Sequence, residues 1–348
     1  MIGRIAMGIQ TPIIRTGDNL SKITIDSILR NTHFENGDIV GITESVVARA
    51  QGNYVTVDDI AKETDRLFGK NATLVLVRPI YSRNRFSMIL KGIARSARKI
   101  YLLMDDFDEV GNPKGVNPWT GVDIEKYYTE ICEQENCKCE INPGYSYGLD
   151  TTGWLDCRLH GKVVPILKSV KPYLGLKDYF PHKCEWGLLG SNKANEETLK
   201  LFPNGELAQK LVEDIQVAVR VKCGVNIDVL VYGDGCFKDP VSGIWEFADP
   251  VAAVAYTSGL LGSPNEIKLK AFADDKYKDL SDKELENAIK DEIRKKDTDL
   301  KGNMASQGTT PRRYIDLIPS LMDLMSGSGD VGTPVILLRQ YRNNYSNA

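Results

Sequence analysis

The sequence has little of several features that define common protein classes. Its 348 residues carry a net charge of only −3, so charge gives no reason to expect a nucleic acid or an anionic membrane as partner. No apolar run is long enough to cross a bilayer, and the N-terminal stretch lacks the apolar core of a signal peptide. The seven cysteines are an odd number, which fits reduced thiols better than a disulfide framework. We therefore expect a cytoplasmic protein with neither a membrane nor a nucleic acid as partner.

Signatures of several enzyme classes are also missing. The three histidines show no H-E-x-x-H spacing and no G-x-S-x-G sequence occurs, which leaves hydrolase chemistry with little support. Neither a Walker A loop nor a Rossmann fingerprint, with a strand before its glycines and a helix after them, is present. Cys132, Cys137 and Cys139 lack the paired C-x-x-C spacing of common zinc sites, although Cys157 or Cys184 would complete a four-cysteine set.

The order of apolar and polar segments predicts an α+β protein, that is, a mixed α/β chain, folded in two lobes. The apolar fraction of 42% and the charged fraction of 26% are ordinary for a globular protein. Strands and helices alternate in residues 1–80 and again in 183–262 and 305–348, which we assign to one core. Residues 81–182, with loops rich in Gly, Pro and Asn, form a second lobe, and 263–304 form a charged helical excursion.

Local patterns in the core predict where its elements begin. Thr16 or Asp18 is the expected N-cap of a helix whose apolar residues follow at helical spacing. The stretch 36–52 starts with an Asn-Gly turn and is expected to continue as a buried strand. Residues 335–338 form a short apolar run, as expected of a buried strand close to the other end of the chain.

A glycine-rich loop stands directly before that last strand. Gly327, Gly329 and Gly332 allow positive φ and a close approach of the backbone to a ligand. The loop is either a plain turn or a cradle that binds phosphate through backbone N–H groups.

Two polar positions beside glycines are candidates for ligand chemistry. Asp234 follows an apolar strand and stands between two glycines, where a carboxylate is a common Mg²⁺ ligand or, alternatively, a turn residue that bonds its own backbone. Asn192 follows Ser191 in a Gly-rich loop. It either binds a phosphate oxygen, a sugar oxygen or a metal-bound water, or it caps a following helix together with Ser191.

A basic segment opens the second lobe. Charge runs of this kind are usually solvated helix faces. Arg83 and Arg85 stand where the helix begins, a position at which the helix dipole favours an anion, and we expect them to bind substrate. The whole basic set is Arg83, Arg85, Lys91, Arg95, Arg98 and Lys99.

Taken in order, these segments resemble the coenzyme F-420-0:gamma-glutamyl ligases, a family that adds glutamate to a deazaflavin cofactor using GTP. Four blocks carry the resemblance: "GIQTPIIRTGDNL", "NGDIVGITESVVARAQG", "LFPNGELAQKLVEDI…VNIDVLVYGDG" and "LMSGSGDVGTPVILLR". The last is the most specific, because this family places a Gly-rich, Asp-containing loop before its final core strand. The blocks cover roughly the first 60 residues and most of 183–262 and 312–341. No motif in residues 81–182 can be aligned with the family.

The resemblance implies a mixed α/β, two-lobed subunit in an intertwined homodimer, with GTP or ATP and Mg²⁺ or Mn²⁺ in a cleft near the dimer interface. It implies that Asp234 binds the metal and that Asp234 and Arg49 are catalytic. The nucleotide-binding residues that it implies are Gly8, Ile9, Gln10, Thr11, Pro12, Glu44, Ser45, Arg49, Asn192, Gly327, Ser328, Gly329, Asp330 and Gly332.

The sequence departs from the family pattern around the nucleotide and metal. Where the family has a metal-binding aspartate three residues before its asparagine, this chain has Leu189, and Glu185 is the candidate replacement. The family's strand hydroxyl and lysine become Glu44 and Arg49, with Ser45 as a neighbouring source of the hydroxyl. Arginine is not a neutral replacement for lysine, because its planar guanidinium presents donors in a fixed fork.

These features predict an acid–amino-acid ligase, which activates a carboxylate as an acyl phosphate and then joins it to an amino acid, glutamate by resemblance. We expect a small acid other than the deazaflavin cofactor as acceptor, bound in the second lobe. The competing function is a non-catalytic or lost-activity paralogue that binds a nucleotide or small anion, which the missing metal ligand at Leu189 supports. Aromatic residues of the second lobe, either stacking partners of the acceptor or ordinary anchors, are Trp119, Tyr145, Tyr147 and Trp154.

Overall fold

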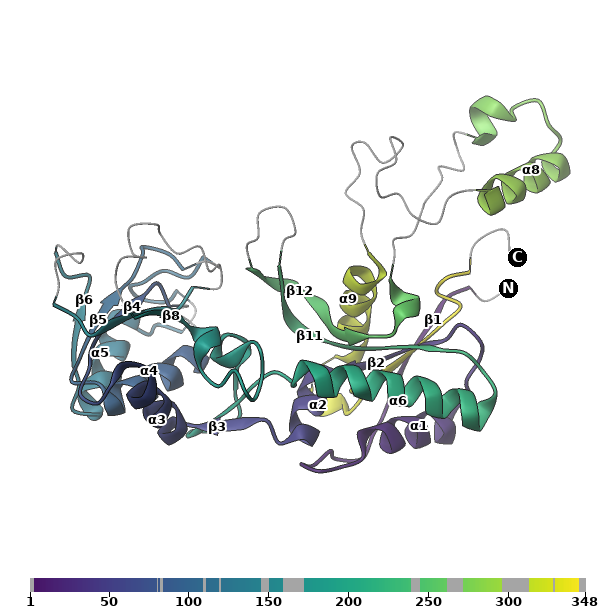
Figure 1. Ribbon diagram of the computed structural model, residues 1–348. Coiled ribbons are helices and arrows are strands. Elements are labelled where there is room, and N and C mark those ends of the chain that lie inside the picture. Colours follow the sequence, from purple (N-terminus) through teal and green to yellow (C-terminus); the bar gives the residue numbers. More distant parts are fainter. Residues whose placement is uncertain are drawn as a thin grey trace.

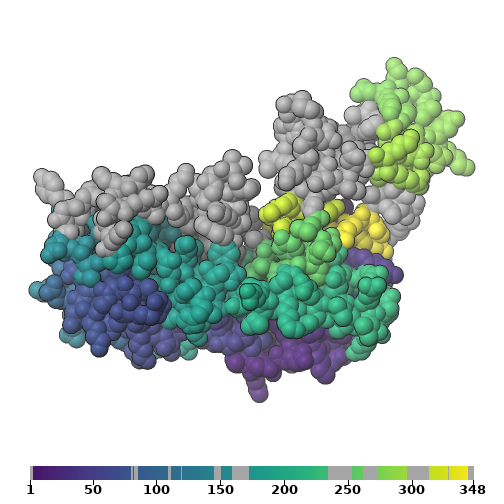
Figure 2. All heavy atoms as spheres, in the orientation of Figure 1, coloured from purple at the N-terminus to yellow at the C-terminus, as the bar shows by residue number. Residues whose placement is uncertain are grey.

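The computed structural model of the protein describes residues 3–79, 81, 84–108, 111–118, 120–144, 150–158, 172–238, 245–261, 272–295, 313–327 and 329–343. Figure 1 shows two lobes side by side, each built around a five-stranded sheet, and an excursion that carries one further helix. In the space-filling view of Figure 2 the blue residues of one lobe lie beside the purple and green residues of the other. The mixed α/β class that the sequence predicts is confirmed, with three sheets among the described residues.

The first lobe is built on a mixed sheet in the order β1-β13-β2-β11-β12. β13 runs antiparallel to both β1 and β2, β11 runs parallel to β2, and β12 returns antiparallel to β11. The earliest and latest strands of the chain therefore pair directly. The strands are β1 (Ile5–Ile9), β2 (Ile39–Thr43), β11 (Asp228–Lys238), β12 (Trp245–Tyr256) and β13 (Val335–Arg339).

Helices cover both faces of this sheet, which explains why its central strands are continuous apolar runs. All five residues of β13 are buried, and burying one Ile, Leu or Val side chain contributes roughly 1.5–3 kcal/mol. One face packs against α1 (Leu20–Asn31) and α6 (Gly205–Cys223), and the other packs against α9 (Tyr314–Ser326).

The N-cap of α1 differs from the expectation. Its cap is Asn19, whose side chain accepts a hydrogen bond of 2.9 Å from a backbone N–H three residues further on. Asp18 accepts instead from the N–H of Arg15, and so shapes the turn before the helix. Thr16 lies further upstream and donates its hydroxyl to the carbonyl of Arg49. Only the residue directly before the first helical turn can reach that turn's free N–H groups, which is why Asn19 is the cap.

The segment after β2 is a helix, not the continued strand that the sequence predicts. α2 spans Glu44–Gln51 and ends at Gly52, whose φ of 66° lies in the left-handed region that glycine tolerates. β2 stops where the N–H of Thr43 bonds the carbonyl of Pro334, just outside β13. The β-branched valines of this segment favour a strand locally. In the structure one of them, Val47, belongs to α2 and its side chain is buried in the core.

The second lobe contains a fully parallel sheet in the order β6-β5-β4-β7-β8. All five residues of β4 are buried, as expected of a central strand in a parallel sheet. Because β4 belongs to this sheet, the sheet begins before the lobe boundary that the sequence predicts at residue 81. The strands are β4 (Thr73–Val77), β5 (Lys99–Leu103), β6 (Lys138–Ile141), β7 (Gly153–Asp156) and β8 (Tyr173–Gly175).

Three helices lie on one face of the parallel sheet: α3 (Val57–Phe68), α4 (Asn84–Ser96) and α5 (Ile124–Gln134). α3 begins with a capping box in which Thr56 and Asp59 exchange hydrogen bonds. α3 and α4 pack closely at Gly92, where an added Cβ would lie 2.6 Å from Ile60.

A small antiparallel sheet lies between the lobes, in the order β3-β10-β9. Its strands are β3 (Tyr54–Thr56), β9 (Asn192–Lys193) and β10 (Thr198–Lys200). The alternative in which Ser191 and Asn192 cap a helix is wrong, because Asn192 belongs to a strand and the next α-helix, α6, is capped by Asn204. The small sheet thus carries Asn192 and Lys200 toward the first lobe.

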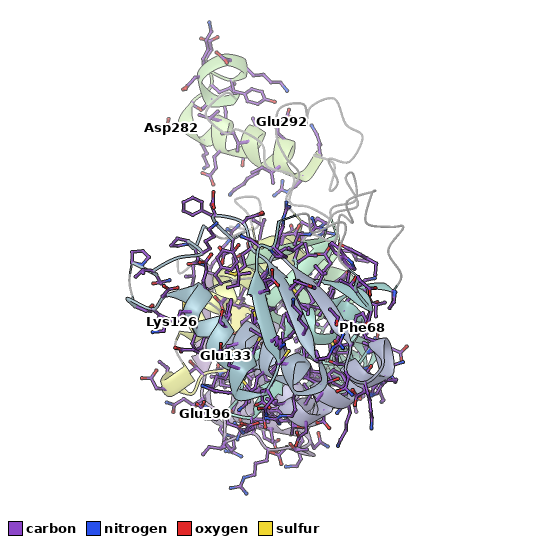
Figure 3. All side chains as sticks on the ribbon, turned by 90° about the vertical axis from the view of Figure 1, so that its left-hand side faces the viewer. Phe68, Lys126, Glu133, Glu196, Asp282 and Glu292 are labelled. Carbon is purple, nitrogen blue, oxygen red and sulfur yellow. The ribbon has the colours of Figure 1, made fainter. Side chains whose placement is uncertain are left out.

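The charged excursion predicted at 263–304 contains α8 (Asp282–Lys295), preceded by a short π-helix (Phe272–Lys276). Figure 3 shows α8, with Asp282 and Glu292 labelled, standing apart from both lobes, as Figure 1 does from the side. An ion pair of 2.7 Å between Lys276 and Glu292 joins the two helical pieces. In the described part of the chain, no helix is long and apolar enough to span a membrane.

Candidate functional site

The register of the first sheet brings three distant segments to one edge. Val335, at the start of β13, pairs with Ile9 at the end of β1 and with Ile42 near the end of β2. The residues after β1, after β2 and before β13 therefore meet in space. Because β11 runs parallel to β2, with Tyr232 opposite Thr43, the residues after Tyr232 reach the same edge.

A cavity of about 430 Å³ opens where these segments meet. Its wall consists of the loop after β1, the exposed side of α2, the end of α9 and the glycine-rich loop before β13. The residues that the sequence predicts to bind a nucleotide and that line this cavity are Thr11, Pro12, Ser45, Arg49, Gly327, Gly329 and Gly332.

The glycine-rich loop forms one wall of the cavity. Gly327 and Gly332 have φ of 63° and 71°, values that residues with a side chain rarely adopt. The N–H of Thr11 donates to the carbonyl of Gly332 at 3.3 Å, and the hydroxyl of Thr333 donates to the carbonyl of Ser326 at 3.0 Å. The glycines follow G-x-G-x-x-G spacing, but a helix precedes them and a strand follows, the reverse of the Rossmann arrangement.

Two helix ends give the cavity opposite electrostatic sides. α2 begins at Glu44, so the free N–H groups of its first turn, beside Ser45 and Val46, carry partial positive charge. α9 ends at Ser326, so its last carbonyls and the carboxylate of Asp323 make the facing wall negative. An anion is therefore favoured on the α2 side and a cation on the α9 side.

Arg49 adds a full positive charge to the α2 side. Its side chain is exposed in the cavity wall, and its guanidinium has no ion-pair partner among the described residues. Its backbone carbonyl accepts hydrogen bonds from Thr16 and Gly52, which fix the end of α2. A guanidinium offers five N–H donors in a fork that matches phosphate oxygens. Arg49 is therefore placed to bind a phosphate group in the cavity.

A buried ion pair lies next to Ser45. Glu44 is 5% exposed, and its two carboxylate oxygens lie 2.8 and 2.9 Å from Nζ of Lys200. Lys200 stands in β10 directly opposite Asn192 of β9. The sequence prediction includes Glu44 and Asn192 but misses Lys200. The available signal was a lysine inside the otherwise apolar run 199–202.

Gly233 brings the middle of β11 against this ion pair. A Cβ at Gly233 would lie 2.0 Å from Cγ of Glu44, so a close approach of the two chains requires glycine here. Asp234 follows in β11, where the strand register shifts; the structure describes its backbone, and its side chain lies outside the described part. Three residues predicted separately, Glu44, Asn192 and Asp234, thus belong to backbone segments that converge near Lys200.

Tyr232 lies beneath the end of α9 and was not predicted. Its side chain is fully buried, and burial raises the pKa of Tyr232 to about 12, against a smaller lowering by Ser326. The hydroxyl therefore stays protonated at neutral pH. Tyr232 also packs beside Gly41, where an added Cβ would lie 3.1 Å from the tyrosine ring. The tyrosine thus belongs to the core cluster between α9 and the sheet.

Comparison with protein-family models decides the relationship of the chain to known proteins. The model of the F420-0:gamma-glutamyl ligase family matches residues 8–340. The chain belongs to this family. The match includes 81–182, the part for which the motifs give no counterpart. No curated protein matches the chain.

Membership in the F420-0:gamma-glutamyl ligase family implies a nucleotide-dependent ligase. The residue types that converge near Lys200 are ones that a hard divalent cation accepts as ligands. The carboxylates of Glu44 and Asp234 and the amide oxygen of Asn192 are the oxygen ligands that Mg²⁺ and Mn²⁺ prefer. The ammonium of Lys200 already occupies a place beside Glu44, which shows that this place stabilises positive charge. Among the described residues, no group of three or more His, Cys, Asp or Glu is arranged to bind a metal.

Arg85 reaches the loop before Asn192. Its side chain is buried, and its guanidinium donates to the carbonyls of Leu189 at 2.6 Å and Ser191 at 3.4 Å. Leu189, at the position where the family has an acid, is 7% exposed and packs in the core. These contacts give Arg85 the task of positioning the strand that carries Asn192. Its expected role in substrate binding stays a prediction.

Glu185 lies away from the cavity that Arg49 lines. Its carboxylate accepts the N–H of Gly205 at 3.2 Å and so complements the positive end of α6. It lines a separate surface cavity of about 670 Å³ together with Glu206 and Glu213. The structure does not bring Glu185 to the other candidate residues, and a metal-binding role for it stays a prediction.

The remaining predicted residues lie around the cavity or outside the description. Gly8 packs against Thr333, and Ile9 is part of the core. Gln10 donates to the carbonyl of Val331 at 3.5 Å, and Asp330 lies in the exposed 3-10 turn Gly329–Val331. Trp154 is 2% exposed in β7 and is a core anchor. The predictions that fall outside the described residues are Arg83, Trp119, Tyr145, Tyr147 and Ser328.

Proposed function

We propose that this family member is a nucleotide- and divalent-metal-dependent ligase that joins a small acid to an amino acid, with glutamate as the amino acid and GTP or ATP as co-substrate. The observation that carries this proposal is the cavity in which Thr11, Ser45, Arg49 and the glycine-rich loop lie together. Its volume of about 430 Å³ suits a small-molecule site.

We assign the phosphates of the nucleotide to the α2 side of the cavity. The N–H groups at the start of α2 and the guanidinium of Arg49 stabilise negative charge there, and the helix holds both in place before the reaction. This charge develops when the γ-phosphoryl group passes to the carboxylate of the acceptor. The amino group then attacks the acyl phosphate, which forms the amide bond and releases inorganic phosphate.

Asp234, Glu44 and Asn192 are the residues that would hold Mg²⁺ or Mn²⁺. The chemistry that such a cation would supply there is the neutralisation of negative charge on the phosphates. Asp234 would contribute its charge from the middle of β11, and Asn192 would orient a phosphate oxygen or a water molecule from β9.

The second lobe is the part that we assign to the acceptor. In parallel sheets of this kind ligands bind outside the carboxyl ends of the strands where the strand order reverses, which is between β4 and β7 here. Arg78, with φ of 50°, follows β4 and pairs with Asp105 at 2.9 Å. A second, buried pair joins Asp156, the last residue of β7, to Arg158. The acceptor that we propose for this lobe is a small acid other than the deazaflavin cofactor.

The experiment supplies purified protein with GTP or ATP, Mn²⁺ and glutamate, and adds either F420-0 or a panel of small carboxylic acids. We expect phosphate release that depends on both the acid and glutamate, and an amide product in the mass spectrum. Efficient glutamylation of F420-0 would contradict the acceptor assignment and support the ligase. Nucleotide binding without any product would favour the competing function, a paralogue of lost activity, which the buried Leu189 supports.

Family membership also leads us to propose a homodimer. Light scattering at micromolar concentration should give twice the mass of the 38.7 kDa chain. A monomer mass would refute this assembly.

A further inference from the structure

Glu44 and Lys200 form a buried ion pair at the edge of the candidate site. Nζ of Lys200 lies 2.8 and 2.9 Å from the two carboxylate oxygens, and the two side chains are 7% and 11% exposed. Taking both charges out of water has a large cost that their attraction offsets only in good geometry. A buried ion pair is therefore weak evidence for a purely stabilising role, and its location becomes the informative feature.

The backbone segments around this pair carry further residues of the types that supply oxygen ligands. Glu44 follows β2, Asp234 follows Gly233 in the neighbouring strand β11, and Asn192 stands opposite Lys200 in the small sheet. The side chain of Glu44 passes so close to Gly233 that a Cβ there would lie 2.0 Å from Cγ of Glu44. The ammonium of Lys200 thus brings a positive charge to the point where these backbone segments meet.

We propose that Glu44 is a direct ligand of the divalent cation and that the ammonium of Lys200 is its placeholder, bound to Glu44 without the cation and released when Mg²⁺ or Mn²⁺ binds. This inference rests on the metal-dependent function proposed above. An ammonium and a divalent cation repel each other at the distance at which both would contact one carboxylate. Lys200 carries its charge on a flexible four-carbon stem, so it can turn away to a phosphate group once the cation has arrived.

The first lobe contains a second buried pair that serves as a matched control. Arg339, at the end of β13, bonds the carboxylate of Asp38 at 3.1 and 3.0 Å, and the two side chains are 9% and 1% exposed. The start of β13 borders the cavity, so this pair lies at the opposite edge of the sheet. Removing the guanidinium of Arg339 therefore shows the effect of losing a buried ion pair at a place where no metal site is proposed.

The test measures thermal unfolding and Mn²⁺ binding, both without nucleotide. Lys200→Met removes the ammonium and retains an unbranched side chain of similar length. We expect its melting temperature to fall in EDTA and to recover in about 1 mM Mn²⁺, because a ligand that binds only the folded state stabilises it. Its dissociation constant for Mn²⁺, taken from the electron paramagnetic resonance signal of free Mn²⁺, should fall at least about tenfold below that of the wild type.

Three further variants complete the test. Arg339→Met should also lower the melting temperature, and Mn²⁺ should not restore it. Glu44→Gln should weaken Mn²⁺ binding at least about tenfold. The double variant Glu44→Gln with Lys200→Met, which removes both charges of the pair, should fold and should bind Mn²⁺ no more tightly than Glu44→Gln. If Lys200→Met folds only after Mn²⁺ is added, the placeholder role is supported as well.

Unchanged or weaker Mn²⁺ binding by Lys200→Met would overturn the proposal, as would wild-type affinity in Glu44→Gln or equal recovery of Arg339→Met. None of these measurements needs turnover. A protein without ligase activity that shows the expected Mn²⁺ behaviour refutes only the proposed function. An active ligase without that behaviour refutes only the exchange of Lys200 for the cation.

Discussion

Arg49 supplies the positive side chain of the cavity wall, and its removal tests the phosphate assignment. We expect Arg49→Ala to raise the dissociation constant for GTP in Mn²⁺ at least about tenfold, because a hydrogen bond to a charged group contributes roughly 1.5–3 kcal/mol. Titration calorimetry measures this change. Arg49→Lys should lose less, since it keeps the charge but not the fork of donors.

Arg66 is the control residue for that measurement. It stands in α3 of the second lobe and pairs with Glu63 at 2.6 Å. Arg66→Ala should bind GTP as tightly as the wild type. The phosphate assignment fails if Arg49→Ala binds normally, or if both variants lose affinity to the same extent.

Cys139 and Cys184 differ in thiol chemistry, although neither is in a disulfide. A hydrogen bond from Cys132 lowers the pKa of Cys139, whereas burial raises the pKa of Cys184 to about 12. The thiolate is the nucleophile, so at pH 8 Cys139 should react with iodoacetamide well before Cys184. Peptide mass spectrometry after timed quenching measures both rates of labelling. As a control, the two cysteines should be labelled at equal rates in urea, where the folded environments are lost. Faster labelling of Cys184 in the native protein would contradict these environments.

Thr11, Ser45 and Arg49, which the sequence singles out for nucleotide binding, line one cavity, and their role stays a prediction. Prediction from the sequence missed the partners that folding brings from afar. Lys200 binds Glu44 across 156 positions of the chain, and Arg85 reaches Leu189 across 104. No local pattern carries information about contacts of this separation, so the partners of these two buried cations could not be named from the sequence.

At the level of elements, the contact between α3 and α4 at Gly92 gives a sharp test of the second lobe. Alanine in a helix normally gains up to about 1 kcal/mol over glycine, but a Cβ at Gly92 would lie 2.6 Å from Ile60 and 3.0 Å from the carbonyl of Val57. Overpacking of this kind costs roughly 1–3 kcal/mol, so we expect Gly92→Ala to lower the free energy of unfolding in urea. Gly115→Ala, with nothing within 4 Å, should have little effect. Equal stability of the two variants would show that the helices do not meet as described.

The sequence did not predict α2, a helix that carries Ser45 and Arg49 into the cavity wall. Its valines favour a strand, and its eight residues are too few to show a helical period clearly. At the last residue of β2, the N–H of Thr43 donates to the carbonyl of Pro334, a contact with the far end of the chain. By contrast, β13 and the glycine-rich loop were predictable, because a continuous apolar run after flexible glycines is informative locally.

For the whole molecule, the order of segments along the chain predicts two lobes, and the structure contains a five-stranded sheet on each side of a small linking sheet. The strand order of the second lobe was not predictable, because β4 pairs with β7 nearly eighty residues away. Its sheet starts at Thr73, and the domain boundaries derived from the sequence stay predictions. The pairing register of β13 with β1 and β2 explains where the candidate site lies, because it brings the ends of β1 and β2 to the start of β13.

The central claim is that one nucleotide binds where these three segments meet, and hydrogen exchange with mass spectrometry tests it without knowledge of the acceptor. Adding GTP or ATP with Mn²⁺ should slow exchange together in peptides that cover 8–14, 43–49 and 323–334, because they surround one cavity. Peptides that cover β5, in the second lobe, should exchange at an unchanged rate. Protection confined to the second lobe, or protection of only one of the three segments, would contradict the account.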